Sequence, residues 1–415
     1  MAQITSFLPY RYSPKAGELH DLVTQPYDKI SPKMQEDYLA RSPYNLVRVI
    51  LGPRRDDDTE ANNVYTRASK YFSDWIASGI LQKEAEPSIY AYSQEFQVPD
   101  SGETLSRKGF IALGAVEDYE GCVVHRHEQT LSGPKKDRRQ VLEHTKAHFG
   151  QIFMIYPDPE GRVDALIEGA LPAEPTATIT DEYGVLHTLY KISDQDVIAA
   201  VTREMADKKL IIADGHHRYE TALAYRKDNP DSKDAERVMM TFVNMHSRGL
   251  RILATHRVLK GLSDFNLQAF LKKAAGSFKI DRYDSVASLK QAFEQPAPSS
   301  IRIGMVVKGE EGVFLLERDR NNGLDVRVLH EDILEGLLDI TPEAVRDEHY
   351  IQYVRGLEAA ADMVTSGQAQ VAFLLEATTV EQVAETSFAG GCMPQKSTDF
   401  YPKLLTGLTI YKLER

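Results

Sequence analysis

The hydrophobic and polar positions of this 415-residue chain follow two periods. Apolar residues recur about every 3.6 positions over residues 62–81 and 194–207, and this spacing predicts amphipathic helices. Short apolar or alternating runs predict strands at residues 45–51, 88–98, 108–117, 151–157, 187–192, 208–213, 237–245 and 250–259. Because strands and helices alternate along the chain, we expect a mixed α/β (α+β) fold.

The pattern of elements changes near residue 260. After it, the expected elements are a helix at 267–278, a hairpin at 301–318, a strand leading into a helix at 325–340, a helix at 350–367, and strands at 368–377 and 408–414. No Gly, Ser or Pro linker marks a border, so the borders rest on this change alone. We predict three regions: 1–90, 91–260 and 261–415.

The segment KKLIIADGHHRYETALAYRK places chemistry where a strand gives way to a helix. Asp214 and Gly215 mark the turn. The start of a helix exposes main-chain N–H groups and the positive end of the helix dipole, which together attract anions. His216, His217 and Arg218 fall in the first helical turn, where cations oppose the dipole. We therefore predict a bound phosphate, with Arg218 suited to a bidentate contact.

Two other interpretations of this segment stay open on the residues alone. In a structural one, Asp214 caps the helix, Arg218 pairs with Glu220 or a distant acid, and the histidines are satisfied core or surface groups. In a metal-binding one, His216 and His217 hold an ion, although adjacent histidines seldom chelate one ion together.

Composition narrows the classes of function. The net charge of −12 disfavours a nucleic-acid partner. Cys122 and Cys392 form no CxxC pair, so neither a disulfide framework nor a cysteine zinc site is expected. The N-terminus lacks a signal-peptide core, and no apolar run approaches the roughly 18 residues that span a bilayer. We expect a cytoplasmic protein without membrane contact. GxSxG, HExxH, GxGxxG and P-loop motifs are absent from the sequence.

A second polar block, HEQTLSGPKKDRR, supplies acid, base and cation groups. Phosphoryl transfer needs cations around the migrating group and a carboxylate that orients the acceptor hydroxyl. His127 and Glu128 are candidates for acid and base catalysis, and Lys135 and Arg138 for phosphate clamps. The structural alternative is a solvated, charged helix start.

Further polar residues are candidates for the same substrate cleft. Arg48 lies in a predicted strand among apolar residues, so it must face solvent, an acid or a ligand. Asp28 follows a Pro-Tyr turn and has helix capping as its structural alternative. A histidine such as His256 is more often a satisfied core group. The complete set is Asp28, Arg48, Asn244, His256, Lys396, Ser397 and Thr398.

The motif IADGHHRYETALAY resembles the signature of the prokaryotic family called domain of unknown function 1015. The blocks QPYDKISP, SPYNLVRVILG, HEQTLSGPKKDR, VNM, LATHRVLKGL and MPQKSTDFYPKLLTGL are similar to that family's blocks and stand in the same order. The resemblance covers essentially the whole chain, and it implies no established reaction.

The DGHHR turn also resembles the nucleotide-binding motif of the ParB/sulfiredoxin-like fold, which includes ParB-type CTPases, sulfiredoxins and free-serine kinases. This resemblance implies such a core near residues 91–260 between family-specific flanks. It places phosphates on the turn from Gly215 to Arg218 and makes Glu128 the base toward a substrate hydroxyl. Sulfiredoxin chemistry is not expected, because His216 or His217 stands where that reaction needs a cysteine.

The resemblance and the residues together predict a small-molecule phosphotransferase. Its nucleotide is ATP or ADP, with CTP the third choice, and Mg²⁺ bridges the phosphates through Asp214. Serine is the first expected substrate in the kinase direction, and phosphoserine in the phosphatase direction. The alternative from another class is a ParB-like nucleotide switch that binds or hydrolyses the nucleotide without transfer. No nucleic-acid or membrane partner is expected, and the sequence assigns no oligomeric state.

Overall fold

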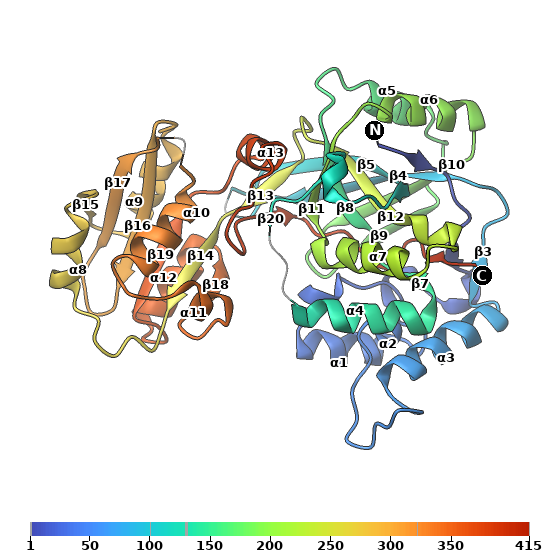
Figure 1. The fold of residues 1–415 in the computed structure, drawn as a ribbon, viewed down its shortest axis with the longest axis horizontal. Helices are drawn as coiled ribbons and strands as arrows, with labels where there is room; N and C mark the ends of the chain where they lie inside the picture. Colours follow the sequence, from blue (N-terminus) through green and yellow to red (C-terminus); the bar gives the residue numbers. More distant parts are fainter. Residues whose placement is uncertain (1, 100, 129–131, 322, 415) are drawn as a thin grey trace. The chain divides into compact units, whose positions relative to one another are not determined.

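The chain folds into two compact units (Figure 1). The structure, a computed structural model, describes all residues except 1, 100, 129–131, 322 and 415, and of residues 132–134 it describes the backbone alone. Unit 1 consists of Met1–Arg126, Thr130–Leu250 and Pro402–Arg415, and unit 2 of His127–Gln129 and Arg251–Tyr401. The three regions expected from the sequence are a different division, and they stay a prediction.

Unit 1 is built on a nine-stranded mixed sheet. Its strands follow the order β6-β11-β8-β12-β5-β4-β10-β9, and β1 pairs with β5. Among these described strands, the β6–β11 and β8–β12 pairs are parallel and the others antiparallel. The bounds are β1 Ile4–Thr5, β4 Ile89–Gln97, β5 Thr104–Ala115, β6 Val124–His125, β8 Ile152–Tyr156, β9 Ala177–Thr180, β10 Leu186–Ile192, β11 Leu210–Asp214 and β12 Arg237–Asn244.

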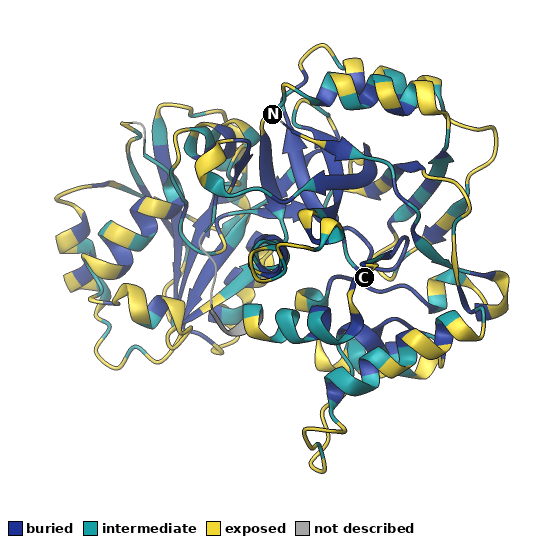
Figure 2. Ribbon diagram, turned by 45° about the vertical axis from the view of Figure 1, so that its right-hand side comes forward, coloured by how far each residue is buried: buried dark blue, intermediate teal, exposed yellow. Residues whose placement is uncertain are grey.

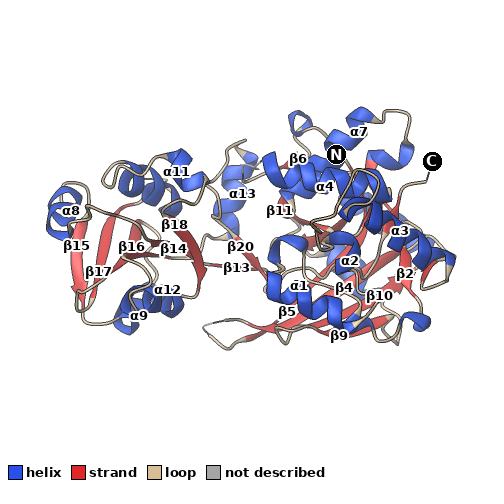
Figure 3. Cartoon of the chain, turned by 90° about the horizontal axis from the view of Figure 1, so that it is seen from below, coloured by secondary structure: helices blue, strands red, loops and turns tan. Residues whose placement is uncertain are grey.

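Helices cover both faces of this sheet. Helices α5 (Arg162–Gly169) and α6 (Gln195–Met205) lie on one side, and α4 (Ser132–Thr145) and α7 (His216–Asp228) on the other (Figure 1). Figure 3 shows α4 and α7 from below. The alternation of side chains along each strand lets both faces bury apolar residues. Figure 2 shows the strands as largely buried and the outward faces of the helices as exposed.

An N-terminal helical layer and the C-terminal segment complete unit 1. Helix α3 (Val64–Ala77) begins at an Asn63 capping box and buries Phe72 and Trp75 in a cluster that also contains Ile410. The other elements are α1 Pro32–Arg41, α2 Val47–Ile50, β2 Tyr10–Tyr12, β3 Leu81–Lys83, β7 Ala147–His148, β21 Tyr411–Lys412 and the 3₁₀ helices Pro14–Ala16, Leu19–Asp21, Tyr27–Lys29, Tyr119–Gly121 and Lys233–Glu236. Because β21 pairs with β7, the end of the chain is part of the unit 1 core.

Unit 2 contains a six-stranded antiparallel sheet in the order β15-β17-β16-β19-β14-β18, with an apolar cluster on each face. A separate pair joins β13 to β20. The strands are β13 Arg251–Leu253, β14 Thr255–Leu259, β15 Lys279–Tyr283, β16 Ser300–Val307, β17 Val313–Asp319, β18 Ile351–Arg355, β19 Val371–Leu375 and β20 Asp399–Tyr401. The helices are α8 Leu267–Ala274, α9 Val286–Glu294, α10 Asp325–Val328, a π-helix at Leu329–Glu335, α11 Pro342–Arg346, α12 Leu357–Thr365 and α13 Val380–Phe388.

Three expected elements are wrong. Residues 45–51 contain helix α2 rather than a strand, because the Asn45 side chain accepts from the Val47 N–H at 2.9 Å and starts a helical turn. Residues 350–367 contain strand β18 before α12, and Gly356, with φ of 87°, separates the two. Residues 325–340 begin with α10 and the π-helix rather than with a strand.

The mixed α/β class expected from the sequence is confirmed by the two sheets and their helices. Within the described ranges, every helix falls short of the length and apolar character that a membrane crossing requires.

The close packing of β5 against β12 in unit 1 requires glycine at position 109. A Cβ atom there would lie 2.4 Å from the Phe242 carbonyl oxygen of the neighbouring strand. Gly109→Ala is therefore expected to lower the free energy of unfolding by about 1–3 kcal/mol, the usual cost of overpacking. Denaturant unfolding of purified protein measures it.

Gly169→Ala is the matched control. A Cβ at this α5 position meets nothing within 4 Å, and alanine favours helix, so no loss of stability is expected. Equal unfolding midpoints for wild type and Gly109→Ala would contradict the packing assigned to β5 and β12.

Candidate functional site

The strand-to-helix turn expected at Asp214 and Gly215 is present. Strand β11 ends at Asp214, and α7 begins at His216. Gly215 has φ of 96°, a conformation that favours glycine. A Cβ at Gly215 would also lie 3.0 Å from the Arg218 guanidinium carbon. The turn therefore needs glycine both for its backbone and for the close approach of Arg218.

Asp214 is the centre of an ion-pair cluster. Its Oδ2 accepts from Arg218 Nη2 at 2.7 Å, and its Oδ1 accepts from Lys403 Nζ at 3.2 Å. Burial alone would raise the pKa of this carboxyl, but Lys403, Arg218 and Lys29 together hold the pKa well below its usual range. Asp214 thus carries a negative charge that two cations share directly.

The helix cap and the metal interpretations can be compared with these contacts. Gly215, not Asp214, is the N-cap residue of α7, and it makes no side-chain cap bond. Both oxygens of Asp214 face cations, so Mg²⁺ binding at this carboxylate requires an exchange of partners. Among the described residues, no group of three or more His, Cys, Asp or Glu side chains forms a metal site.

A cavity of about 70 Å³ lies beside the turn within unit 1. By the same measure one water molecule needs roughly 10–15 Å³, so the cavity holds several waters or a small polar group. Its lining includes the polar residues Tyr27, Arg138, His148, Arg218, Thr221 and Thr406, the apolar residues Ile50, Val141, Leu142 and Phe149, and Gly150. Two candidate phosphate ligands, Arg138 of α4 and Arg218 of α7, therefore line one cavity.

Arg138 is held in the cavity wall by an aromatic ring and a carboxylate. Its guanidinium carbon lies 3.9 Å from the centre of the Tyr27 ring, and its Nε donates to Asp137 Oδ2 at 3.0 Å. Burial, followed by the Asp28 charge, raises the pKa of Tyr27 to about 12, so its hydroxyl stays protonated. Burial lowers the pKa of His148 to about 4, so this histidine is neutral near pH 7.

The other residues predicted around this turn lie outside the lining of the cavity. Lys135 pairs with Glu220 of α7, and Arg126 approaches the same carboxylate at 3.8 Å. His216 is buried, and the His217 carbonyl accepts from the Thr221 hydroxyl at 2.7 Å. The clamp role predicted for Lys135 and the phosphate contacts predicted for the two histidines stay predictions.

In unit 2 the structure brings together two segments far apart in the sequence. Glu128 Oε1 accepts from the Lys396 N–H at 2.8 Å, and His127 Nε2 lies 2.7 Å from Thr398 Oγ1. The His127 carbonyl accepts from the Met393 N–H at 2.7 Å. Ser397 Oγ donates to the Pro394 carbonyl at 2.5 Å. The segment with His127 and Glu128 and the segment 396–398 therefore form one cluster, which belongs to unit 2. The α7 turn belongs to unit 1.

The remaining candidates use their polar atoms in structural contacts. Asn244 Nδ2 donates to the Asp158 carbonyl at 2.8 Å and to Asp164 Oδ2 at 2.9 Å. His256 Nδ1 accepts from the Leu375 N–H at 3.1 Å, and burial lowers the pKa of His256 to about 4.

Arg48 and Asp28 lie in the N-terminal part of unit 1. Arg48 is in helix α2, which corrects the expected strand, and donates to the Leu39 carbonyl at 2.7 Å. Asp28 lies in the 3₁₀ helix beside Tyr27. Substrate contacts at these residues, and at Asn244 and His256, stay predictions.

Sequence analysis did not assign Gln94 and Arg107 to the site. Lys403 belongs to the segment MPQKSTDFYPK, which the sequence offers as a contribution to the cleft, and it lies five residues after Thr398. Gln94 and Arg107 each have polar neighbours on both sides in β4 and β5, so the sequence pattern predicts no buried role for either.

Comparison with known proteins identifies the family. The chain belongs to the family of proteins of unknown function called DUF1015, whose model matches residues 4–340. This match confirms the resemblance seen in the sequence motifs. A sequence comparison with curated proteins finds no match.

Solved structures show distant likeness. A variant free serine kinase in complex with ADP has 14% identity and a TM-score of 0.37, covering 69% of this chain and 89% of its own. SbnI with a C-terminal truncation from Staphylococcus aureus has 11% identity and a TM-score of 0.37, covering 72% and 87%. A conserved hypothetical protein from Pyrococcus furiosus has 13% identity and a TM-score of 0.35, covering 67% and 87%. TM-scores below 0.5 assign no function to this chain.

The ion pairs of Asp214 predict a pH-dependent contribution to stability. Asp214→Asn removes the charge that Arg218 and Lys403 share, and is expected to cost about 1.5–3 kcal/mol near pH 7. Because the folded-state pKa is depressed, wild type holds this stabilisation above the unfolded carboxyl pKa of about 3.9 and loses it as the pH falls toward the folded pKa. Denaturant unfolding at pH 7, 5, 4 and 3 measures the difference.

The control is Asp74→Asn, which breaks an exposed pair with Lys70 of the same helix. It is expected to cost less than about 0.5 kcal/mol at every pH. A difference between wild type and Asp214→Asn that stays constant down to pH 3 would contradict the charged state assigned to Asp214.

Proposed function

We propose that unit 1 binds the phosphates of a nucleotide in the cavity beside the α7 turn and that the protein is a small-molecule phosphotransferase. The observation that carries this proposal is that Arg138 and Arg218, taken from two separate sequence motifs, line the same cavity. Both guanidinium groups can bind a phosphoryl group through bidentate hydrogen bonds. Arg218 also lies in the first turn of α7, where the helix dipole favours an anion.

Neutral donors beside the cavity support the same ligand. Thr406 lies in its wall, and Gly150 brings main chain without a side chain there. Thr221 also lines the cavity, but its hydroxyl donates to the His217 carbonyl. The buried side-chain amide of Gln151, next in sequence to Gly150, has no hydrogen-bond partner among the residues that the structure describes. A buried amide without partners costs about 1–3 kcal/mol, so a polar ligand that reaches it gains affinity.

For the transfer step we propose Glu128 as the general base. The oxygen of the acceptor hydroxyl attacks the terminal phosphorus of the nucleotide, and the bond from that phosphorus to the leaving nucleotide oxygen breaks. The hydroxyl proton passes to the Glu128 carboxylate. Serine is the first acceptor to test. Asp214 is the candidate ligand for Mg²⁺, which would neutralise part of the phosphate charge. In the phosphatase direction, water would attack the phosphorus of phosphoserine, the bond from that phosphorus to the serine oxygen would break, and serine and inorganic phosphate would be released.

Binding is expected to depend on Arg218. Arg218→Ala should weaken the binding of ATP, ADP or CTP with Mg²⁺ by about 10- to 100-fold, the loss of a charge-assisted contact. Isothermal titration calorimetry measures the affinity. Arg203→Ala, an exposed arginine of α6, is the matched control and should bind as wild type does. Equal affinity for wild type and Arg218→Ala would overturn the proposed site.

Transfer is expected to depend on Glu128. Mass spectrometry of protein incubated with L-serine, Mg²⁺ and each nucleotide should detect phosphoserine for wild type, and at least about 100-fold less for Glu128→Gln, the scale of acid–base catalysis. Nucleotide affinity should change little in this variant. A nucleotide that is bound or hydrolysed without transfer to serine would reject the transferase and favour the ParB-like switch.

A further inference from the structure

Lys403 contacts the turn before α7 from a distant part of the sequence. Its ammonium contacts Asp214 at 3.2 Å across 189 residues of sequence, and its side chain is only 10% exposed. It lies beyond residue 340, where the family match ends. A lysine side chain loses much rotamer freedom when it is fixed in this way, so other contacts must stabilise its position.

We infer that Lys403 is a phosphate-binding residue of this site and that the buried pair Gln94 and Arg107 positions it. The inference rests on the proposed nucleotide site. Lys403 is outside the cavity lining, but it shares the Asp214 carboxylate with Arg218, which lines the cavity. In the structure, Asp214 holds Arg218 and Lys403 through its two different oxygens. A phosphoryl group offers both cations negatively charged oxygen acceptors, as the Asp214 carboxylate does. Arg218 would bind such oxygens with its planar guanidinium, and Lys403 with its compact ammonium charge.

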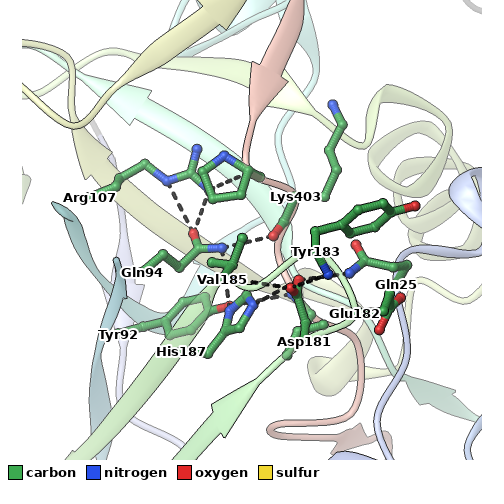
Figure 4. Close-up of polar contacts among 12 residues, drawn as sticks. Gln25, Tyr92, Gln94, Arg107, Asp181, Glu182, Tyr183, Val185, His187 and Lys403 are labelled. Atoms are coloured by element: carbon green, nitrogen blue, oxygen red, sulfur yellow. Dashed lines mark hydrogen bonds and ion pairs between the residues drawn. The ribbon is translucent and has the colours of Figure 1, made fainter. Parts of the chain in front are cut away.

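Gln94 and Arg107 hold the main chain next to Lys403 (Figure 4). Gln94 Nε2 donates to the Lys403 carbonyl at 2.8 Å, and Arg107 Nη2 donates to the Pro402 carbonyl. Arg107 Nε also donates to Gln94 Oε1 at 3.1 Å. Because that oxygen must face Arg107, the amide nitrogen of Gln94 must face Lys403. The two side chains thus act as one clamp on the C-terminal segment.

Burying the Arg107 cation in this clamp is unfavourable in free energy. It is 1% exposed, and its guanidinium carbon lies 4.6 Å from the centre of the Phe153 ring. Burial lowers the pKa of Arg107 to about 10, and it stays a cation near pH 7. Burying a cation costs several kcal/mol unless hydrogen bonds compensate. Arg107 donates to Gln94 and to the Pro402 carbonyl, so the bonds that hold the segment carrying Lys403 also compensate part of this cost.

A second buried chain of hydrogen bonds fixes the same segment two residues further on. The Tyr92 hydroxyl accepts from the Leu405 N–H at 3.4 Å and lies 2.6 Å from His187 Nδ1. His187 Nε2 in turn lies 3.1 Å from Asp181 Oδ2. Figure 4 shows this chain beside the Gln94 amide. The main chain around Lys403 is therefore held at Pro402, Lys403 and Leu405 by side chains of the central sheet.

The binding role is tested by substitution of Lys403 with ADP and Mg²⁺ as the probe, in calorimetry. Lys403→Gln is expected to weaken binding by about 10- to 100-fold, whereas Lys403→Arg, which keeps the charge, should retain most of the affinity. Lys191→Gln is the matched control, since Lys191 is also a half-buried lysine of unit 1 that pairs with a carboxylate, Glu84, at 2.8 Å. It should leave the affinity unchanged.

Wild-type affinity in Lys403→Gln, together with a loss in Arg218→Ala, would overturn the role of Lys403 and leave the proposed function standing. Unchanged affinity in both variants, or no binding of ADP or pyrophosphate by wild type, would overturn both.

The positioning role is tested by a double-mutant cycle. Gln94→Leu should weaken ADP binding in wild type but cause no further loss in Lys403→Gln, because it acts through that lysine. Gln94→Asn, which keeps an amide in a shorter side chain, provides the same cycle if Gln94→Leu does not fold. Losses that add independently in the cycle would overturn the positioning of Lys403 by Gln94.

Discussion

The carboxylate of Asp214 is the interaction on which the proposed site depends. It ends strand β11, pairs with Arg218 one turn into α7, and pairs with Lys403 of the C-terminal segment. Cations in the first turn of a helix are unfavourable beside the helix dipole. The half-buried negative charge of Asp214 offsets that repulsion, so Arg218 and Lys403 can be kept at the helix start before any ligand arrives. A site organised in this way loses less entropy when it binds its ligand.

The position of Lys403 depends on buried polar side chains in the central strands of the unit 1 sheet. Arg107 is buried among apolar residues, and its charge is compensated by hydrogen bonds to Gln94 and to the main chain at Pro402. Burial lowers the pKa of Arg107, and interactions with Tyr92 and then Asp214 oppose this shift in part, which links the clamp electrostatically to the turn. The segment after residue 401 therefore packs as part of unit 1, although more than a hundred residues of unit 2 precede it.

The sequence predicted the parts of the site that are local. An apolar run followed by Asp-Gly specifies a strand, a turn and a helix start within a few residues, and β11, Gly215 and α7 follow that pattern. The same reasoning failed for residues 45–51, because burial on all sides removes the difference between the strand and helix periods and the Asn45 contact then starts a helix. No local pattern encodes the contacts of the clamp. Gln94 and Arg107 are 13 residues apart, and Gln94 and Lys403 are 309 residues apart.

Binding and chemistry are assigned to side chains of different units, and this makes the proposal separable by experiment. Arg218 and Lys403 belong to unit 1, whereas Glu128 makes its hydrogen bond to Lys396 within unit 2. Each unit has its own apolar core, so a polar substitution in one leaves the packing of the other intact. A loss of affinity in unit 1 variants with retained affinity in Glu128→Gln would therefore reflect the two steps themselves, because a general loss of structure would affect both measurements together.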